Sequence, residues 1–369
     1  LSKCDRTREP WWTVYTKTPR AQGPTQWTKH AGVNCQAPRS AELLKTDDIG
    51  SRTALSSPFA PHPLPPSTSP SPFFEGWFTR VVAPKDDLSF SVIVASFRPA
   101  HAPGVTQVWT ALLLDRGGKV TTVQRFLDPE RLRLTVDGGK NVSSPPRLGT
   151  PARFRWAWTP GPNDSEQDNG TLVVDDDTAR LDFTFRGDGR TIRVEADLSH
   201  RVPWDRAAPN SAGPEGWLAG AEGLLPTHYF VQSLASRASF ELTTSSSEHQ
   251  NVQRETGAGF GHQEANWGGT FPTAWIWAEG ISADGTAQLL LTAGEFDIAG
   301  ITTQQAIVAV RTPARSYTFR NIDLDEVLSK PSPCGLLPSF SLEATGHAET
   351  TRVAIEISAP RGTFSKPLE

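Results

Sequence analysis

The chain has 369 residues, enough for one large domain or two of ordinary size, and its 37% hydrophobic and 21% charged residues exclude a wholly disordered protein. A net charge of −4 gives no electrostatic reason to expect nucleic acid or an anionic membrane as the main partner. The apolar runs, such as SVIVASF at 91–97, are far too short to span a bilayer, so we expect no membrane span.

Three features of the sequence indicate the secretory pathway. The chain lacks methionine even at position 1, so we expect that a signal peptide or other leading segment has been removed. Cys4 and Cys35 flank a segment with little core-forming pattern, and a disulfide between them would contribute about 3–4 kcal/mol. Glycosylation sequons begin at Asn141, Asn163 and Asn169, in stretches typical of exposed loops. We therefore predict a protein that is secreted or resides in the secretory pathway.

A proline-rich stretch at 57–72 is followed by short runs rich in Val, Ile, Thr, Phe and Trp. Several runs alternate in character, so that Phe154, Trp156 and Trp158 fall on one face of an extended chain. Turn sequences such as RGGK and RGDGR separate the runs, which is typical of antiparallel hairpins. The first set of predicted strands is 88–97, 106–115, 119–126, 131–136, 153–159, 171–176, 180–187 and 191–198.

A second set of strands follows residues 201–226, a connection too long for a simple hairpin. Within this second half, GAGFG at 257–261 is interpreted as a flexible loop and LDEVLS at 324–329 as at most a short turn. The predicted strands of the second set are 237–244, 273–280, 287–294, 304–311, 315–321, 340–346 and 351–358.

The two sets predict an all-β protein of two antiparallel units, barrels or sandwiches, packed side by side. We place an irregular N-terminal segment at 1–57, one β unit at 58–233 and the other at 234–369. The sequence lacks the motifs of phosphate-binding loops, dinucleotide folds and serine nucleophiles, and its histidines do not have metal-ligand spacing. We therefore predict neither a cofactor nor a metal.

Two clusters set a glutamate among large aromatic residues. FFEGWFTR at 73–80 contains Glu75, and GHQEANWGGTFPTAWIWAEG at 261–280 contains Glu264 and three tryptophans. A desolvated carboxyl group holds its proton more tightly, which suits a general acid or a hydrogen-bond donor. Alternatively, Glu75 forms a buried structural ion pair with Arg80 or another arginine, and the tryptophans fill a core.

His228 and Tyr229 are a third candidate group, because either side chain at the mouth of a barrel can donate a hydrogen bond to a ligand carbonyl. The alternative interpretation is a histidine satisfied within the core beside a tyrosine at its boundary.

These residues carry a resemblance to a known family. SPFFEGWFTRV followed by LSFSVIVASF resembles the N-terminal signature of the tocopherol cyclase-like proteins, and EANWGGTFPTAWIWAEG resembles their second signature. HYFVQSL is similar to a tyrosine-containing strand of the same family. The resemblance covers roughly residues 58–360. It implies a two-part, all-β, lipocalin-related architecture, shared more distantly with carotenoid hydratases and some fungal Diels–Alderases.

The clusters and the resemblance together nominate the site. The predicted catalytic residues are Glu75, Glu264, Asn266, His228 and Tyr229. The predicted substrate-binding residues are Phe74, Trp77, Arg80, His262, Trp267, Phe271, Trp275 and Trp277. One position departs from the family pattern, because Ala265 stands where the family usually has lysine. We interpret this departure as favouring pericyclic chemistry over alkene protonation.

We therefore expect a cofactor-free cyclase that forms a pyran- or chroman-type oxygen heterocycle on a small hydrophobic substrate, a terpenoid or polyketide natural product. The expected reaction is a hetero-Diels–Alder addition of a quinone methide to an alkene in an apolar pocket, where holding both reacting ends lowers the barrier. Two alternatives stay open: a secreted lipocalin-like carrier of apolar ligands without catalysis, and an alkene hydratase.

Overall fold

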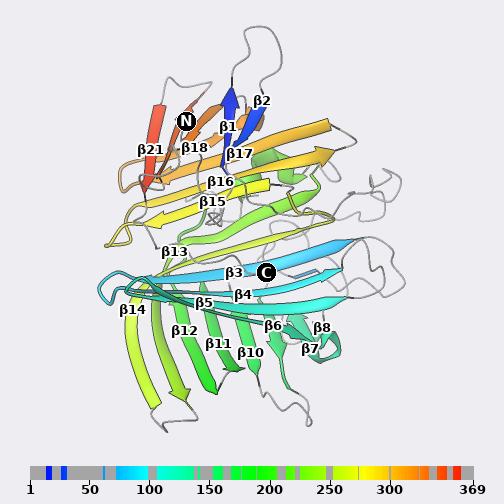
Figure 1. Cartoon of the computed structure of the whole chain (residues 1–369), viewed down its shortest axis with the longest axis vertical. Coiled ribbons are helices and arrows are strands. Elements are labelled where there is room, and N and C mark those ends of the chain that lie inside the picture. The colour runs from blue at the N-terminus through cyan, green and yellow to red at the C-terminus, as the bar shows by residue number, and fades with distance from the viewer. Residues whose placement is uncertain are drawn as a thin grey trace. The chain divides into compact units, whose positions relative to one another are not determined.

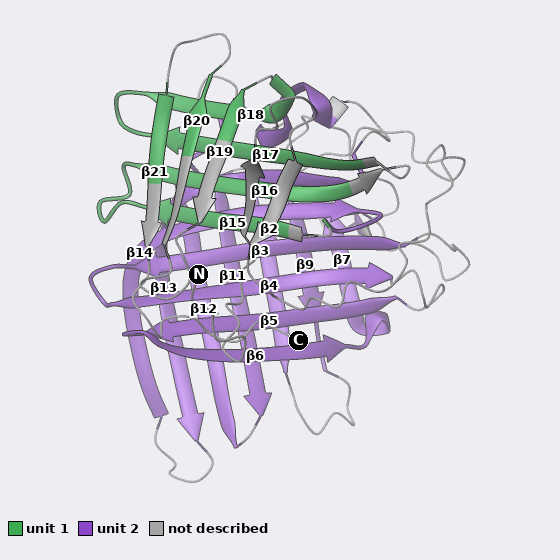
Figure 2. Cartoon of the chain, turned by 45° about the horizontal axis from the view of Figure 1, so that its top comes forward, with its two compact units in different colours: residues 1–44, 272–369 green, residues 45–271 purple. Residues whose placement is uncertain are grey.

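The computed structural model divides the chain into two compact units, coloured separately in Figure 2. Unit 1 comprises residues 1–44 and 272–369, and unit 2 comprises residues 45–271. The boundary expected between residues 233 and 234 falls inside a continuous strand, β13 (Thr227–Ser246). The structure describes residues 14–18, 26–30, 61–62, 72–98, 106–136, 140–141, 153–160, 168–175, 177–187, 189–205, 213–220, 225–246, 252–272, 274–298, 301–323, 325–331, 339–346 and 352–358.

Unit 2 is built on one twelve-stranded antiparallel sheet in the order β6-β5-β4-β3-β14-β13-β12-β11-β10-β9-β7-β8 (Figure 1). Its strands are β3 (Phe73–Ala83), β4 (Leu88–Arg98), β5 (Gln107–Arg116), β6 (Lys119–Leu127), β7 (Leu132–Val136), β8 (Lys140–Asn141), β9 (Phe154–Trp158), β10 (Asn169–Val174), β11 (Thr178–Gly187), β12 (Arg190–Ser199), β13 and β14 (Val252–Gly268). Two 3-10 segments, η2 (Pro129–Arg131) and η3 (Gly213–Gly220), lie in the connections.

The sheet of unit 2 curls so that its two halves face each other across one core. Strict alternation drives this: every second residue of β3 is buried, and Phe154, Trp156 and Trp158 of β9 are all buried. Figures 1 and 2 show β3–β6 crossing β10–β12, and the core lies between these two layers. Trp77 of β3 contacts Phe154 of β9, with 4.3 Å between the ring centroids. These contacts join strands that are distant in the sheet order.

The long strands β13 and β14 form the bend between the two layers. The register of the pair shifts between Val231 and Ser233 and again between Ser233 and Ser236, the irregularity that lets a strand turn a corner. On β14, a Cβ at Gly259 would lie 2.1 Å from the backbone oxygen of Val82. The interpretation of 257–261 as a loop was therefore wrong. All three glycines lie within β14. Gly259 permits close approach of the neighbouring backbone, whereas Gly257 and Gly261 lie against the side chains of Phe240 and Leu198.

We expect Gly259→Ala to destabilise unit 2 by about 1–3 kcal/mol, because the added methyl group meets backbone atoms that cannot rotate away. Urea unfolding followed by tryptophan fluorescence measures the loss. Gly280→Ala is the matched control, since the nearest atom to its Cβ is the Leu289 Cβ at 3.6 Å. Equal stability of the two variants would contradict the packing explanation of this bend.

Unit 1 contains a four-stranded antiparallel sheet, β15-β16-β17-β18, a three-stranded sheet, β19-β20-β21, and the hairpin β1-β2. One core joins residues of the larger two sheets, among them Leu291, Val308, Val327 and Ala344. The strands are β1 (Val14–Thr18), β2 (Gln26–His30), β15 (Ala274–Ile281), β16 (Gln288–Ile298), β17 (Ile301–Arg311), β18 (Ser316–Arg320), β19 (Glu326–Pro331), β20 (Ser339–Thr345) and β21 (Arg352–Ser358), and a 3-10 turn, η4 (Asn321–Asp323), follows β18.

The turn between β15 and β16 is held by the exposed residue Asp284. Hydrogen bonds from the Ser282 hydroxyl, and then from the Thr286 backbone N–H and hydroxyl, lower the pKa of the Asp284 carboxyl to about 2. The carboxylate is therefore ionised throughout the neutral range and pairs with these three donors.

The all-β prediction with barrel- or sandwich-like antiparallel units is confirmed. The predicted turn at 324–329 was wrong, since β19 begins at Glu326 and pairs with β20. Its alternation is too short to stand out in the sequence, and pairing with β20 supplies the hydrogen bonds. None of the helical segments that the structure describes has the length and apolar character needed to cross a bilayer.

Candidate functional site

The predicted residues of unit 2 lie on three neighbouring strands, β3, β14 and β13. Trp267 of β14 is directly opposite Glu75 of β3 and His228 of β13, so these three side chains share one face of the sheet. Asn266 is opposite Gly76 and Tyr229, and lies on the other face. We call the face of Glu75 the first face and the face of Tyr229 the second face.

On the first face, Glu75 is buried and bound to His62. The backbone N–H of His62 donates to both carboxylate oxygens, at 3.0 and 3.1 Å, and its Nδ1 lies 2.8 Å from Oε1. The alternative pairing of Glu75 with Arg80 does not form, because alternate residues of β3 place them on opposite faces. Glu75 thus anchors the short segment at 61–62 to the sheet.

Trp267 lies between two histidines of the first face. Its ring centroid is 5.4 Å from that of His62 and 5.4 Å from that of His228, with the His228 ring nearly parallel to the indole. The His228 Nδ1 lies 3.0 Å from an oxygen of Glu215, which is buried on η3. Two carboxylate–imidazole pairs therefore flank one indole.

On the second face, Glu264 is buried and accepts from a tyrosine and lies beside a histidine. The Tyr229 hydroxyl donates to Glu264 Oε2 at 2.5 Å, and His262 Nε2 lies 3.0 Å from the same oxygen. His262 is 0% exposed, whereas Tyr229 is half-buried. Tyr229 is therefore the member of this cluster that a ligand can reach, with Glu264 and His262 behind it. Such a cluster can hold, donate and recover a proton or hydrogen bond.

Apart from Trp267, the predicted aromatic residues separate into three environments. Trp77 is 4% exposed and is part of the core of unit 2, as the structural alternative expected. Phe74 packs edge-on against Phe271, with 5.2 Å between ring centroids. Trp275 and Trp277 belong to unit 1, where alternation on β15 places Ile276 toward the core and both tryptophans on the opposite face.

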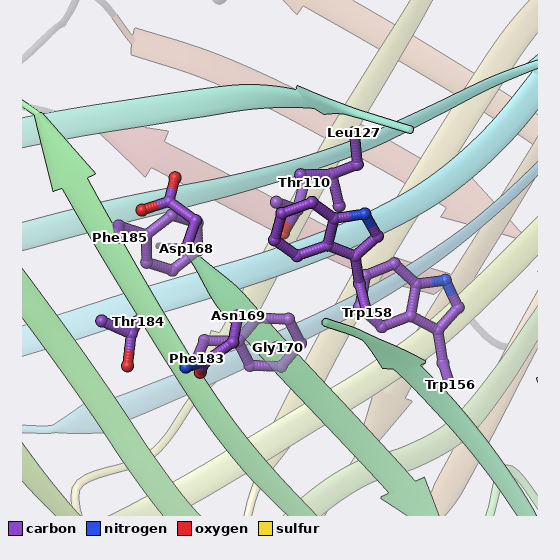
Figure 3. Close-up of a pocket in the computed structure, with 10 residues that line it drawn as sticks. All are labelled: Thr110, Leu127, Trp156, Trp158, Asp168, Asn169, Gly170, Phe183, Thr184 and Phe185. Carbon is purple, nitrogen blue, oxygen red and sulfur yellow. The ribbon is translucent and has the colours of Figure 1, made fainter. Parts of the chain in front are cut away.

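A small cavity lies elsewhere in unit 2, between the two layers of the curled sheet (Figure 3). Its volume is about 10 Å³, counted as space for the centre of a water molecule, and it can hold about one water. Trp156 and Trp158 line it beside Phe183, Phe185 and Asp168. None of the residues predicted to bind substrate lines this cavity.

The remaining predicted positions are placed as follows. Asn169 is the exposed first residue of β10, and Asn141 ends β8, so glycosylation at both stays a prediction. Cys4, Cys35 and Asn163 lie outside the described residues. No group of three potential metal ligands occurs in the described ranges of the chain.

Sequence reasoning missed His62 and Glu215. Both lie in irregular Pro- and Gly-rich segments, where no periodicity marks a residue as facing the sheet. Glu215 is flanked by Gly213 and Gly216, which is the one signal the sequence offers of a tight turn carrying an acid.

Residues 71–361 match the family model described as tocopherol cyclase-like. This chain belongs to the tocopherol cyclase-like family. The match spans both glutamate clusters, so the resemblance drawn from the two signatures is confirmed.

One solved structure resembles this family member at the level of fold, and a second was matched with a low TM-score. The structure of CghA with Sch210972 has a TM-score of 0.52 and 15% identity, covering 84% of each chain. Kievitone hydratase from Nectria haematococca has a TM-score of 0.32 and 8% identity, covering 84% of this chain and 99% of the hydratase. The search of curated proteins found no match.

Proposed function

We propose that this protein is a cofactor-free cyclase that closes a pyran- or chroman-type oxygen heterocycle on a hydrophobic terpenoid or polyketide. Membership of the tocopherol cyclase-like family supports the class of reaction. The observation that carries the proposal is the Tyr229–Glu264 contact, in which a partly exposed phenol is backed by a buried carboxylate.

The proposed reaction is a hetero-Diels–Alder addition of a quinone methide to an alkene. One C–O and one C–C bond form as the π bonds rearrange, and no atom is gained or lost. Negative charge grows on the quinone methide oxygen, which a well-placed hydrogen-bond donor stabilises. Tyr229 is that donor in the proposal, and Asn266, on the same second face, is the candidate for orienting the substrate. His228 lies on the first face and is not part of this donor set.

The cluster behind Tyr229 allows the phenol to change partners. When the Tyr229 O–H turns to a substrate oxygen, Glu264 Oε2 keeps the nearby His262 Nε2 as a donor, 3.0 Å away. The buried carboxylate is then not left without a hydrogen bond, which would cost about 1–3 kcal/mol. Tyr229 can therefore donate a hydrogen bond to the substrate and return to Glu264 without giving up its proton.

Glu264 is preferred over Glu75 as the carboxylate of the reactive site, where it supports Tyr229 as an acceptor. Both oxygens of Glu75 accept from the backbone N–H of His62, so turning that carboxyl toward a substrate would release the segment at 61–62. We assign Glu75 to holding this segment. On the second face, which Tyr229 shares, Phe74 packed against Phe271 supplies apolar surface for the substrate.

A product assay with the full-length chain tests the proposed function. The chain is incubated with a quinone-methide precursor and a terpene alkene, and the products are separated by chiral chromatography. We expect a faster reaction than in buffer and one dominant stereoisomer of the dihydropyran. Tight binding of the substrate without any rate or stereochemical gain would identify a carrier instead, and an alcohol product would identify a hydratase.

A further inference from the structure

The beginning of β13 carries two candidate donors on an edge that lacks a neighbouring strand. β12 pairs with β13 from Ser246 only as far as Arg237, where Ser199 is the last partner. In the described ranges, no strand pairs with β13 before that point on the same side. Backbone N–H groups there need other acceptors, and Leu234 donates to the Val202 carbonyl at 2.8 Å.

At the start of β13, the Glu215 carboxylate supplies the hydrogen-bond acceptor that a neighbouring strand would otherwise provide. Its Oε1 accepts the backbone N–H of Tyr229 at 2.5 Å, and its Oε2 lies 3.0 Å from the His228 Nδ1. Glu215 is 6% exposed, so water competes little for these contacts. One carboxylate thus contacts two consecutive residues whose side chains serve opposite faces of the sheet.

The local sequence is built to bring this carboxylate to β13. Gly213 has φ 74° and Gly216 has φ 59°, both in the left-handed region that glycine adopts without strain. A Cβ at Gly213 would lie 2.7 Å from the Phe230 Cδ2, so only glycine lets η3 approach the strand so closely. The turn GPEG therefore holds Glu215 against the strand that carries His228 and Tyr229.

We propose that Glu215 is a positioning residue that fixes the ring tautomer of His228 and the backbone position of Tyr229. This inference rests on the proposed function for its catalytic consequence. Because both oxygens of Glu215 act only as acceptors, His228 must carry a proton on Nδ1. The ring is then held against Trp267 on the first face, while the same carboxylate fixes the backbone from which Tyr229 projects to the second face.

The substitution Glu215→Gln tests the inference with almost no change of shape. A glutamine has one acceptor oxygen, whereas Tyr229 N–H and His228 Nδ1–H are two donors. If the amide oxygen keeps the backbone contact, its NH₂ group faces Nδ1 and drives the ring proton to Nε2. Ring ¹⁵N chemical shifts of the histidine-labelled full-length chain report this tautomer, and His228→Gln assigns the signal.

We expect His228 to be protonated on Nδ1 in the parent chain and on Nε2 in Glu215→Gln. We also expect kcat of the cyclisation to fall on the order of tenfold, with KM changed less than about twofold, because the Tyr229 donor is misplaced while the apolar surface is intact. Glu241→Gln is the matched control: it removes a carboxylate on the same strand, one that pairs with Arg254. It should alter neither readout.

An unchanged His228 tautomer in Glu215→Gln would overturn the inference. A changed tautomer with unaltered turnover would also overturn it, because Glu215 would then have no effect on the reaction. Absence of turnover in the parent chain would instead refute the proposed function, and the tautomer alone would then decide whether Glu215 positions His228.

Discussion

Replacing Tyr229 with phenylalanine is expected to lower kcat of the proposed cyclisation about 10²-fold, while the protein still folds and binds its substrate. Loss of one preorganised donor to a developing oxyanion typically has an effect of this size. Phenylalanine keeps the ring, so KM should change little. Steady-state kinetics with the quinone-methide precursor measures both parameters. Tyr317→Phe, which removes a hydroxyl that accepts a hydrogen bond from exposed Arg315, is the control and should retain full activity.

Glu264→Gln separates the two possible chemistries of this site. A glutamine oxygen can still accept from Tyr229, so a pericyclic reaction should retain most of its rate. A reaction that starts with protonation of an alkene by Glu264 should instead slow by about 10²–10⁴-fold, the usual contribution of a general acid. A larger loss in Glu264→Gln than in Tyr229→Phe would therefore contradict the hetero-Diels–Alder proposal.

The second prediction with a large expected effect concerns the stability of unit 2. It rests on the ion pair between Arg125 and Asp168, which links the two layers of the curled sheet. Arg125 on β6 donates from Nε to Asp168 at 2.9 Å, and Asp168 also accepts the backbone N–H of Arg186 on β11. A further bond joins the Arg125 guanidinium to the Arg186 carbonyl. β6 begins the sheet order whereas β11 lies in its far half, so these contacts connect the two layers.

We expect Asp168→Ala to cost roughly 3 kcal/mol of unfolding free energy, because it removes the acceptor of the Arg125 Nε, in a partly buried guanidinium, and of a backbone N–H. Urea denaturation monitored by tryptophan fluorescence is a suitable measurement, since Trp156 and Trp158 line the same cavity as Asp168. Asp182→Ala breaks the exposed pair with Arg193 and should cost less than about 1 kcal/mol. Similar losses in both variants would show that the layers do not depend on this pair.

The strands of this protein follow from local pattern, but the site depends on the register between strands. Alternation at 153–159 and 180–187 predicted β9 and β11 correctly, because burial of one face requires a period of two. Glu75 and Glu264 also emerged as candidates, since a carboxyl group among aromatic residues stands out. Their placement on opposite faces was beyond the sequence, because a shift of one residue between β3 and β14 would exchange the faces.

The errors have a common cause in contacts between distant residues. GAGFG was taken for a loop because glycine disfavours strands locally, whereas the approach of Val82 to Gly259 makes glycine necessary there. The partners of the glutamates, His62 and the Tyr229 hydroxyl, lie 13 and 35 residues away along the chain.

The amino-acid sequence by itself determined the all-β class, most strands and the family, and it singled out two glutamates that are buried in the structure. Only the tertiary structure decided which acid is tied to a backbone segment, which one supports a reachable tyrosine, and that Glu215 holds the edge of β13. The physical reason is that alternation is a property of neighbouring residues, whereas hydrogen-bond partners depend on strand register and on turns that carry no periodic signal.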